Sequence, residues 1–191
     1  QDVVASSADE ESYPPDYMES LIVIVRPETY GSELGVDAPK DMTSRPLAGS
    51  YRIFLAFDFP DKLMVTGLKG IPFAGLSEDD LFELAAENTR KRMGAVSRTP
   101  DMGVTVVHSE GGLSPSLLAL PETCTEETPG YYALMLDGFT YAEVPEGAPE
   151  AVTQLARIGM YNLIWEKRGY DTLLHCSGGA WVAADMQALA E

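Results

Sequence analysis

The feature that most constrains this chain is an order of predicted elements that occurs twice. Between residues 50 and 120, apolar runs and turn residues predict a β-hairpin, a helix and a second hairpin, and the same order recurs between residues 130 and 184. Mostly antiparallel strands with one main helix per copy are typical of the α+β class. The sequence therefore predicts an α+β fold made by internal duplication of a β-β-α-β-β unit.

The two predicted helices support this duplication. One begins after Ser77, with Asp80 in the capping-box position, and the other begins after Pro149. Asn88 and Asn162 take equivalent positions in the two helices and are the only asparagines in the chain. Because a rare residue type recurs at the same place, we interpret the repeat as a duplication.

Two short stretches carry the only histidines of the chain: HSEGG begins at His108, and HCSGG begins at His175. In each stretch a Gly-Gly pair follows closely, at Gly111-Gly112 and at Gly178-Gly179. Glycine supplies the positive φ angles that a tight turn needs. We therefore expect the same hairpin in both copies, with the histidine on the strand before the turn.

The beginning of the chain and its cysteines indicate in which cellular compartment the protein is found. We expect residues 1–19 to be flexible and residues 20–191 to form a single domain. The chain begins with Gln1, as it would after signal cleavage, which favours a periplasmic or secreted protein, with the cytoplasm as the alternative. In an exported protein Cys124 and Cys176 are candidates for a disulfide, whereas in a cytosolic one they would be small buried hydrophobes.

The chain is strongly acidic, with 30 Asp and Glu against 13 Lys and Arg and a net charge of −17. Such a field repels phosphate backbones and anionic lipid surfaces, so we expect no nucleic-acid partner. It permits a cationic partner, although acidity more often serves solubility. No apolar run reaches the roughly 18 to 20 residues needed to cross a bilayer, so we expect no membrane span.

Several stretches resemble a known family. They are VIVRP from Val23, PLAGSYRIFLAFDFPDKLM from Pro46, GLSEDDLFELAAENTRKRM from Gly75, EGGLSPSLLALPE from Glu110, and the late LLHCSGGAWV. Together they resemble the domain of unknown function 1444 family, a group of uncharacterised bacterial proteins. The chain departs from that pattern in GLSPSLL, where an acidic residue is expected. The resemblance implies a fold and no site residues.

The histidines and one cysteine are the candidates for chemistry, because the chain lacks the phosphate-loop, dinucleotide, H-E-x-x-H and C-x-x-C motifs. If the copies pack around a pseudo-twofold axis, His108 and His175 could meet and bind a metal ion with Cys176 or Glu110. In a Cys–His nucleophile, Cys176 would pair with His108, since consecutive strand residues face opposite sides. The alternative is that the histidines lie beside turns and the cysteine is structural.

Polar and aromatic residues supply weaker candidates. Asn88 and Asn162 are candidate ligand-binding residues, but we favour amides that tie each helix to a neighbouring backbone, since an unpaired buried amide costs about 1–3 kcal/mol. Asp58 and Asp137 are favoured as turn residues over a catalytic pair. Aromatic side chains gather in the second copy, either as an exposed recognition face or as core: Tyr131, Tyr132, Tyr141, Tyr161, Trp165, Tyr170 and Trp181.

These patterns favour a non-enzymatic binding or interaction module that needs no cofactor and binds an unknown protein or small molecule. The alternative is a small hydrolase or metal-dependent enzyme that uses His108, His175 and Cys176. The two hypotheses differ in geometry, because the enzyme requires both imidazoles to face one cleft.

Overall fold

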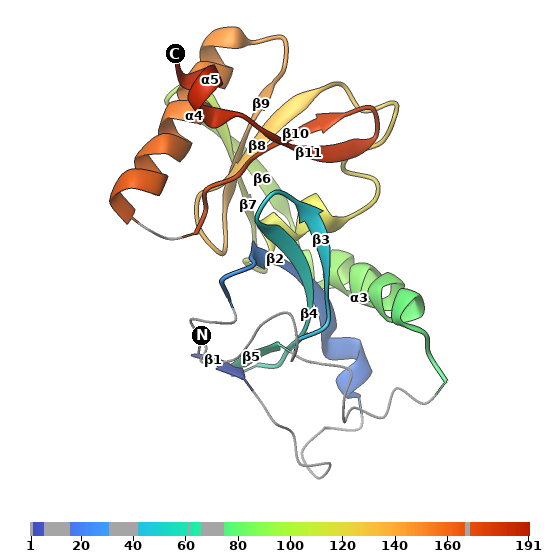
Figure 1. Ribbon diagram of the computed structural model, residues 1–191. Helices are drawn as coiled ribbons and strands as arrows, with labels where there is room; N and C mark the ends of the chain where they lie inside the picture. Colours follow the sequence, from blue (N-terminus) through green and yellow to red (C-terminus); the bar gives the residue numbers. More distant parts are fainter. Residues whose placement is uncertain (1, 6–15, 31–41, 61, 66–74, 167–168) are drawn as a thin grey trace.

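Figure 1 shows the computed structural model of the protein, which describes residues 2–5, 16–30, 42–60, 62–65, 75–166 and 169–191. Two β-sheets lie one above the other in this view, and each is accompanied by one long helix. Antiparallel pairing dominates both sheets, with one parallel pair at the edge of the lower one. The predicted α+β class is confirmed.

The lower sheet, sheet A, has five strands: β1 (Asp2–Ala5), β2 (Leu21–Pro27), β3 (Ser44–Ala48), β4 (Tyr51–Asp58) and β5 (Lys62–Val65). β2 pairs along one edge of β4, while β3 and β5 share its other edge. All seven residues of β2 are buried, which explains why the sequence shows an unbroken apolar run there.

The helix of sheet A, α3 (Glu78–Met93), packs against β2. It begins as the sequence predicts: the Ser77 hydroxyl accepts a hydrogen bond from the backbone N–H of Asp80, and the Asp80 carboxylate accepts one from the backbone N–H of Ser77. Leu81 and Ala85 are buried in one cluster with β2 and β4. A short 3₁₀ helix, η1 (Tyr17–Ser20), leads into β2.

The upper sheet, sheet B, has six strands in the order β11-β10-β8-β9-β7-β6. They are β6 (Val96–Asp101), β7 (Val104–Ser109), β8 (Tyr131–Met135), β9 (Tyr141–Pro145), β10 (Leu173–Ser177) and β11 (Ala180–Ala184). The helices α4 (Pro149–Tyr161) and α5 (Met186–Ala190) pack on one face, here called the outer face. One π-helical turn, η3 (Asn162–Glu166), continues α4.

The opposite, inner face of sheet B joins the two sheets. A cluster of buried residues there combines Val25 and Tyr51 of sheet A with Met135 and Leu174 of sheet B. Leu118, from the 3₁₀ helix η2 (Ser114–Ala119), completes this cluster. The two sheets therefore share a core, in which η2 occupies the corner between them.

The predicted duplication is not shown by the architecture. The order of elements recurs, but the hairpin β4–β5 lies in sheet A while β6–β7 lies in sheet B. All four strands of the second segment, β8 to β11, lie in sheet B. The two segments do not form equivalent units, so the duplication stays a prediction.

The expectation that HSEGG and HCSGG form the same hairpin is wrong. Gly178-Gly179 do form the turn between β10 and β11, with φ angles of 59° and 82°. β7, however, pairs with β6 through a turn at Met102-Gly103, and Gly111-Gly112 lead from β7 into η2. The shared letters therefore serve two different connections.

Gly111 is needed for close approach and not for a turn. Its backbone N–H donates to the carbonyl of Met93 at 2.9 Å, at the end of α3. A Cβ at this position would lie 2.3 Å from the carbonyl oxygen of Arg92. Only glycine lets this loop pack against the helix terminus.

One further expectation concerns the segment 1–19, which the sequence predicts to be flexible. It contains β1 and most of η1, and its residues 1 and 6–15 lie outside the described residues.

β3 is an edge strand that contains a proline. Among the described strands it pairs with β4 alone, so Pro46 is tolerated there.

The two Gly-Gly stretches predict different sensitivities to substitution. Gly111→Ala should lower the free energy of unfolding by at least about 2 kcal/mol, because its Cβ meets a backbone oxygen that cannot move aside. Gly178→Ala is the matched control and should cost about 1 kcal/mol, because a Cβ there meets no atom within 4 Å and only the positive φ is unfavourable. Urea unfolding monitored by circular dichroism measures both, and equal losses would contradict this assignment.

Candidate functional site

Cys124 and Cys176 form a disulfide, with a Cα–Cα distance of 5.7 Å. The sequence proposed this pair for an exported protein, and the structure confirms the bond. Cys176 lies on β10 and faces the inner side of sheet B, while Cys124 belongs to the segment that links η2 to β8. The bond therefore fixes residues 117–130, the end of η2 and the link to β8, against the sheet.

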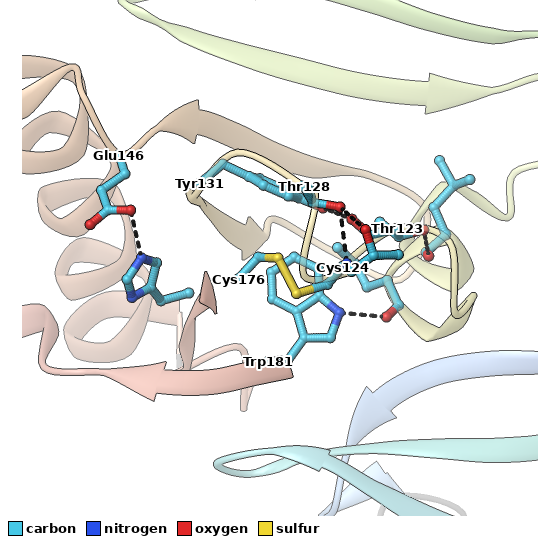
Figure 2. The surroundings of a disulfide bond; sticks show 11 residues. Thr123, Cys124, Thr128, Tyr131, Glu146, Cys176 and Trp181 are labelled. Carbon is cyan, nitrogen blue, oxygen red and sulfur yellow. Dashed lines mark hydrogen bonds and ion pairs between the residues drawn. A yellow bond between two sulfur atoms is a disulfide. The ribbon is translucent and has the colours of Figure 1, made fainter. Parts of the chain in front are cut away.

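Aromatic side chains surround this disulfide (Figure 2). Trp181 and Tyr131 are the cross-strand neighbours of Cys176 on β11 and β8, and their rings meet edge to face at 5.2 Å. The Trp181 indole N–H donates to the carbonyl of Leu118, and the Tyr131 hydroxyl donates to the carbonyl of Thr123. Both rings thus hold the 117–130 segment by its backbone.

His175 lies on the outer face of the sheet, opposite its neighbour Cys176. Its ring stacks on Tyr132 at 4.3 Å between centroids, and its Nε2 is 3.4 Å from a carboxylate oxygen of Glu146. The Nε2 atom is buried and has no hydrogen-bond partner with good geometry. His175 is therefore a packed strand residue with one carboxylate nearby.

His108 does not meet His175. His108 is exposed on β7, and three strand spacings separate β7 from β10 in the sheet, about 14 Å in all. Two imidazoles that share a zinc ion must each approach it to about 2 Å. The pair, which sequence analysis proposed for a metal or catalytic site, is not brought together.

The other members of that proposed site are also engaged elsewhere. Cys176 has no thiol to offer while it is bonded to Cys124. The Glu110 carboxylate accepts a hydrogen bond from the backbone N–H of Ala95. Within the part of the chain that the structure describes, no group of three His, Cys, Asp or Glu side chains is arranged to hold a metal ion.

The two asparagines differ in role. The Asn88 amide donates to the carbonyls of Met18 and Leu21 at 2.9 and 3.0 Å, so it ties α3 to the start of β2, as the favoured interpretation expects. Asn162 caps α4 through its backbone, at the beginning of the π-helical turn. The two are not equivalent, because the helices end differently.

The two aspartates are structural, in agreement with the favoured interpretation. The Asp137 carboxylate accepts hydrogen bonds from the backbone N–H groups of Phe139 and Thr140, which closes the β8–β9 turn. Asp58 ends β4 and contacts Arg92 of α3 through its carbonyl and its carboxylate. They lie in different sheets.

The aromatic side chains of the second segment divide between core and surface. Tyr141 is fully buried, whereas Tyr161 is 58% exposed. Tyr131 and Tyr141 face the inner side of sheet B, where they border a cavity. The side chain of Trp165 lies outside the described part of the chain.

This cavity is the strongest candidate for a functional site. It has a volume of about 550 Å³ and lies between strands β6 to β9 of sheet B and the 117–130 segment. We call it the Glu143 pocket. Six side chains represent its lining: Arg98, Thr105, Thr123, Tyr131, Tyr141 and Glu143.

Glu143 is the central polar group of the pocket. Its side chain is 19% exposed; one carboxylate oxygen accepts a hydrogen bond from the Nε of Arg98 at 2.8 Å, and the other accepts from the Tyr141 hydroxyl at 3.2 Å. Arg98 stands at the rim, with 53% of its side chain exposed. The pocket thus has a carboxylate within it and a guanidinium at its edge.

The phenols keep their protons. Burial, reinforced by the nearby carboxylate of Glu143, raises the pKa of Tyr141 and of Tyr131 well above the ordinary value. Both hydroxyls therefore remain hydrogen-bond donors throughout the neutral range. Neither can serve as a base there.

Sequence analysis missed Arg98 and Glu143. They are 45 residues apart and belong to strands that do not pair directly with each other, since β7 lies between β6 and β9. The signal that existed was alternation: Tyr141 and Glu143 stand two residues apart on one strand, which places them on the same face. Arg98 gave no comparable signal.

The chain was also compared with known proteins. No family model, no curated protein and no solved structure matches it significantly. The resemblance to the domain of unknown function 1444 family therefore stays a prediction. Among the described residues, no helix combines the length and the apolar character needed to cross a membrane.

Loss of the disulfide should destabilise the protein. The bond joins residues 52 positions apart, and closing a loop of that length in the unfolded chain corresponds to about 4 kcal/mol. The double variant Cys124→Ser, Cys176→Ser should lose a free energy of unfolding of this size in denaturant titrations. Reductant should shift the wild-type transition in the same direction and leave the variant unchanged; a wild-type midpoint that ignores reductant would contradict the prediction.

The asparagines should differ in the same kind of measurement. Asn88→Ala removes two hydrogen bonds to buried or part-buried backbone carbonyls and should cost about 1–3 kcal/mol. Asn162→Ala, the matched control, should cost less than about 0.5 kcal/mol. Equal costs would mean that the hydrogen bonds of Asn88 do not tie α3 to β2.

Proposed function

We propose that the protein is a non-enzymatic binding module that takes a small organic molecule in the Glu143 pocket. The pocket itself is the observation that carries the proposal. Its volume of about 550 Å³ falls within the range of about 300–1,000 Å³ that is usual for small-molecule sites. Its lining combines apolar and aromatic surface with a few polar groups, as such sites do.

The wall formed by residues 117–130 supports this proposal because it is held in place. The disulfide anchors it to β10, and Trp181 and Tyr131 bind its backbone. Thr123 and Thr128 close local turns within it. A wall that is ordered before binding reduces the entropy lost on association.

Binding suits this site better than catalysis. The Glu143 carboxylate is engaged by Arg98 and Tyr141, and the phenols remain protonated. The residues on which the hydrolase or metal-enzyme alternative depends lie elsewhere: His108 and His175 are on strands three positions apart, and Cys176 is in a disulfide. What the pocket offers is a surface that can match a ligand in shape and charge.

An exported location belongs to the same proposal. Disulfides persist in oxidising compartments such as the periplasm or the extracellular space and are rare in the cytosol. The bond between Cys124 and Cys176 supports a periplasmic or secreted protein. A binding module there would meet small molecules from the surroundings of the cell.

Occupation of the pocket can be tested with a dye. Nile red, a neutral dye whose fluorescence rises in apolar surroundings, should bind the oxidised protein. Thr105→Phe adds a ring inside the pocket and should weaken dye binding at least about tenfold. Thr99→Phe makes the same change on the exposed outer side of the neighbouring strand and should leave binding unchanged. Equal dye affinity in the two variants would contradict the proposal.

A further inference from the structure

The position of Arg98 indicates what the pocket is suited to hold. Its guanidinium donates through Nε to the Glu143 carboxylate at 2.8 Å. The two phenols of the pocket, Tyr141 and Tyr131, line the same cavity as Arg98. A cationic group is thus already placed beside a carboxylate and two aromatic side chains, and it is supplied by the protein itself.

The pair between Arg98 and Glu143 can be exchanged. One partner is half exposed and the other mostly buried, so the arginine can swing into solvent while the carboxylate stays in the wall. Water can solvate the guanidinium when it leaves, whereas the mostly buried carboxylate would need another cation in its place. Tyr141 keeps its hydrogen bond to the second carboxylate oxygen and would hold Glu143 in the same orientation.

The charges around the pocket favour a positive ligand. Glu122 is the other acidic residue in the lining. Its two carboxylate oxygens accept hydrogen bonds from Nε and Nη2 of Arg90 at 2.6 and 2.7 Å, so its negative charge is already neutralised. Glu143 would be left uncompensated if Arg98 moved out. The net charge of −17 attracts cations to the surface and opposes the approach of anions.

We infer that the pocket binds an organic cation with an apolar body, whose charged group takes the place of the Arg98 guanidinium on the Glu143 carboxylate. This inference rests on the proposed binding function and names its ligand class. The apolar body would lie against Leu117, Pro129 and Tyr131, which are apolar or aromatic members of the lining. Glu143 contacts the ligand, and Tyr141 acts as a positioning residue.

Three aromatic probes of similar size test which ligand charge the pocket prefers. Benzylguanidinium carries a ring and the same cationic group as arginine, benzylurea is its neutral isostere, and phenylacetate is an anion of similar size. Calorimetric titration of the oxidised wild-type protein should give benzylguanidinium an affinity at least about fivefold above that of benzylurea. Phenylacetate should bind more weakly than both.

Variants of the ion pair sharpen the test. Arg98→Ala removes the internal competitor and should raise the affinity for benzylguanidinium about fivefold, whereas a ligand held by Arg98 would lose affinity. In that background, Glu143→Gln should lower the affinity about tenfold without leaving an unpaired arginine. Glu150→Gln removes one negative charge from the exposed start of α4, on the outer face, and is the matched control, with a change below about twofold.

The outcomes separate this inference from the proposed function. If benzylurea or phenylacetate binds as well as benzylguanidinium and Thr105→Phe blocks that binding, the pocket is a site but its ligand is not a cation. If Arg98→Ala weakens the binding of benzylguanidinium, the inference is likewise overturned. If no probe binds and Nile red binding is insensitive to Thr105→Phe, the proposed function itself fails. Thermal unfolding of each variant confirms that it is folded.

Discussion

Leu118 is the residue at which the two halves of the molecule meet. Its side chain is buried between sheet A and the inner face of sheet B, and its carbonyl accepts the indole hydrogen bond of Trp181. Together with the disulfide and the Tyr131 hydroxyl, this contact holds the segment that follows η2 across the sheet. The shared core and the Glu143 pocket both depend on that path, because the segment closes the core on one side and the pocket on the other.

Local signals in the sequence were reliable where the structure they encode is itself local. Ser77 and Asp80 form the predicted capping box, and Asp137 closes the predicted β8–β9 turn. In both cases the hydrogen bonds join residues within three positions of each other, so the sequence contains all the partners. The unbroken apolar run from Leu21 to Val25 is local in the same sense, since it belongs to a single strand, β2, that is buried on both faces.

The failures involve contacts that the chain order does not specify. Gly111-Gly112 resemble a hairpin turn, but the end of α3 comes close to them, and this approach determines their conformation. The pseudo-twofold axis required equivalent halves, whereas β6 and β7 joined the sheet of the second segment. The pairing of Arg98 with Glu143 depends on the same strand order, so it could not be predicted from the spacing of the two residues in the sequence.

The position of Cys176 has a consequence for how sheet B is assembled. Side chains alternate along β10, so a register shift of one residue against β8 would turn His175 to the inner face and Cys176 away from Cys124. The native bond, with its Cα–Cα distance of 5.7 Å, requires Cys176 to face the inner side of the sheet. Once formed, the disulfide therefore opposes a one-residue slip of β10 against β8.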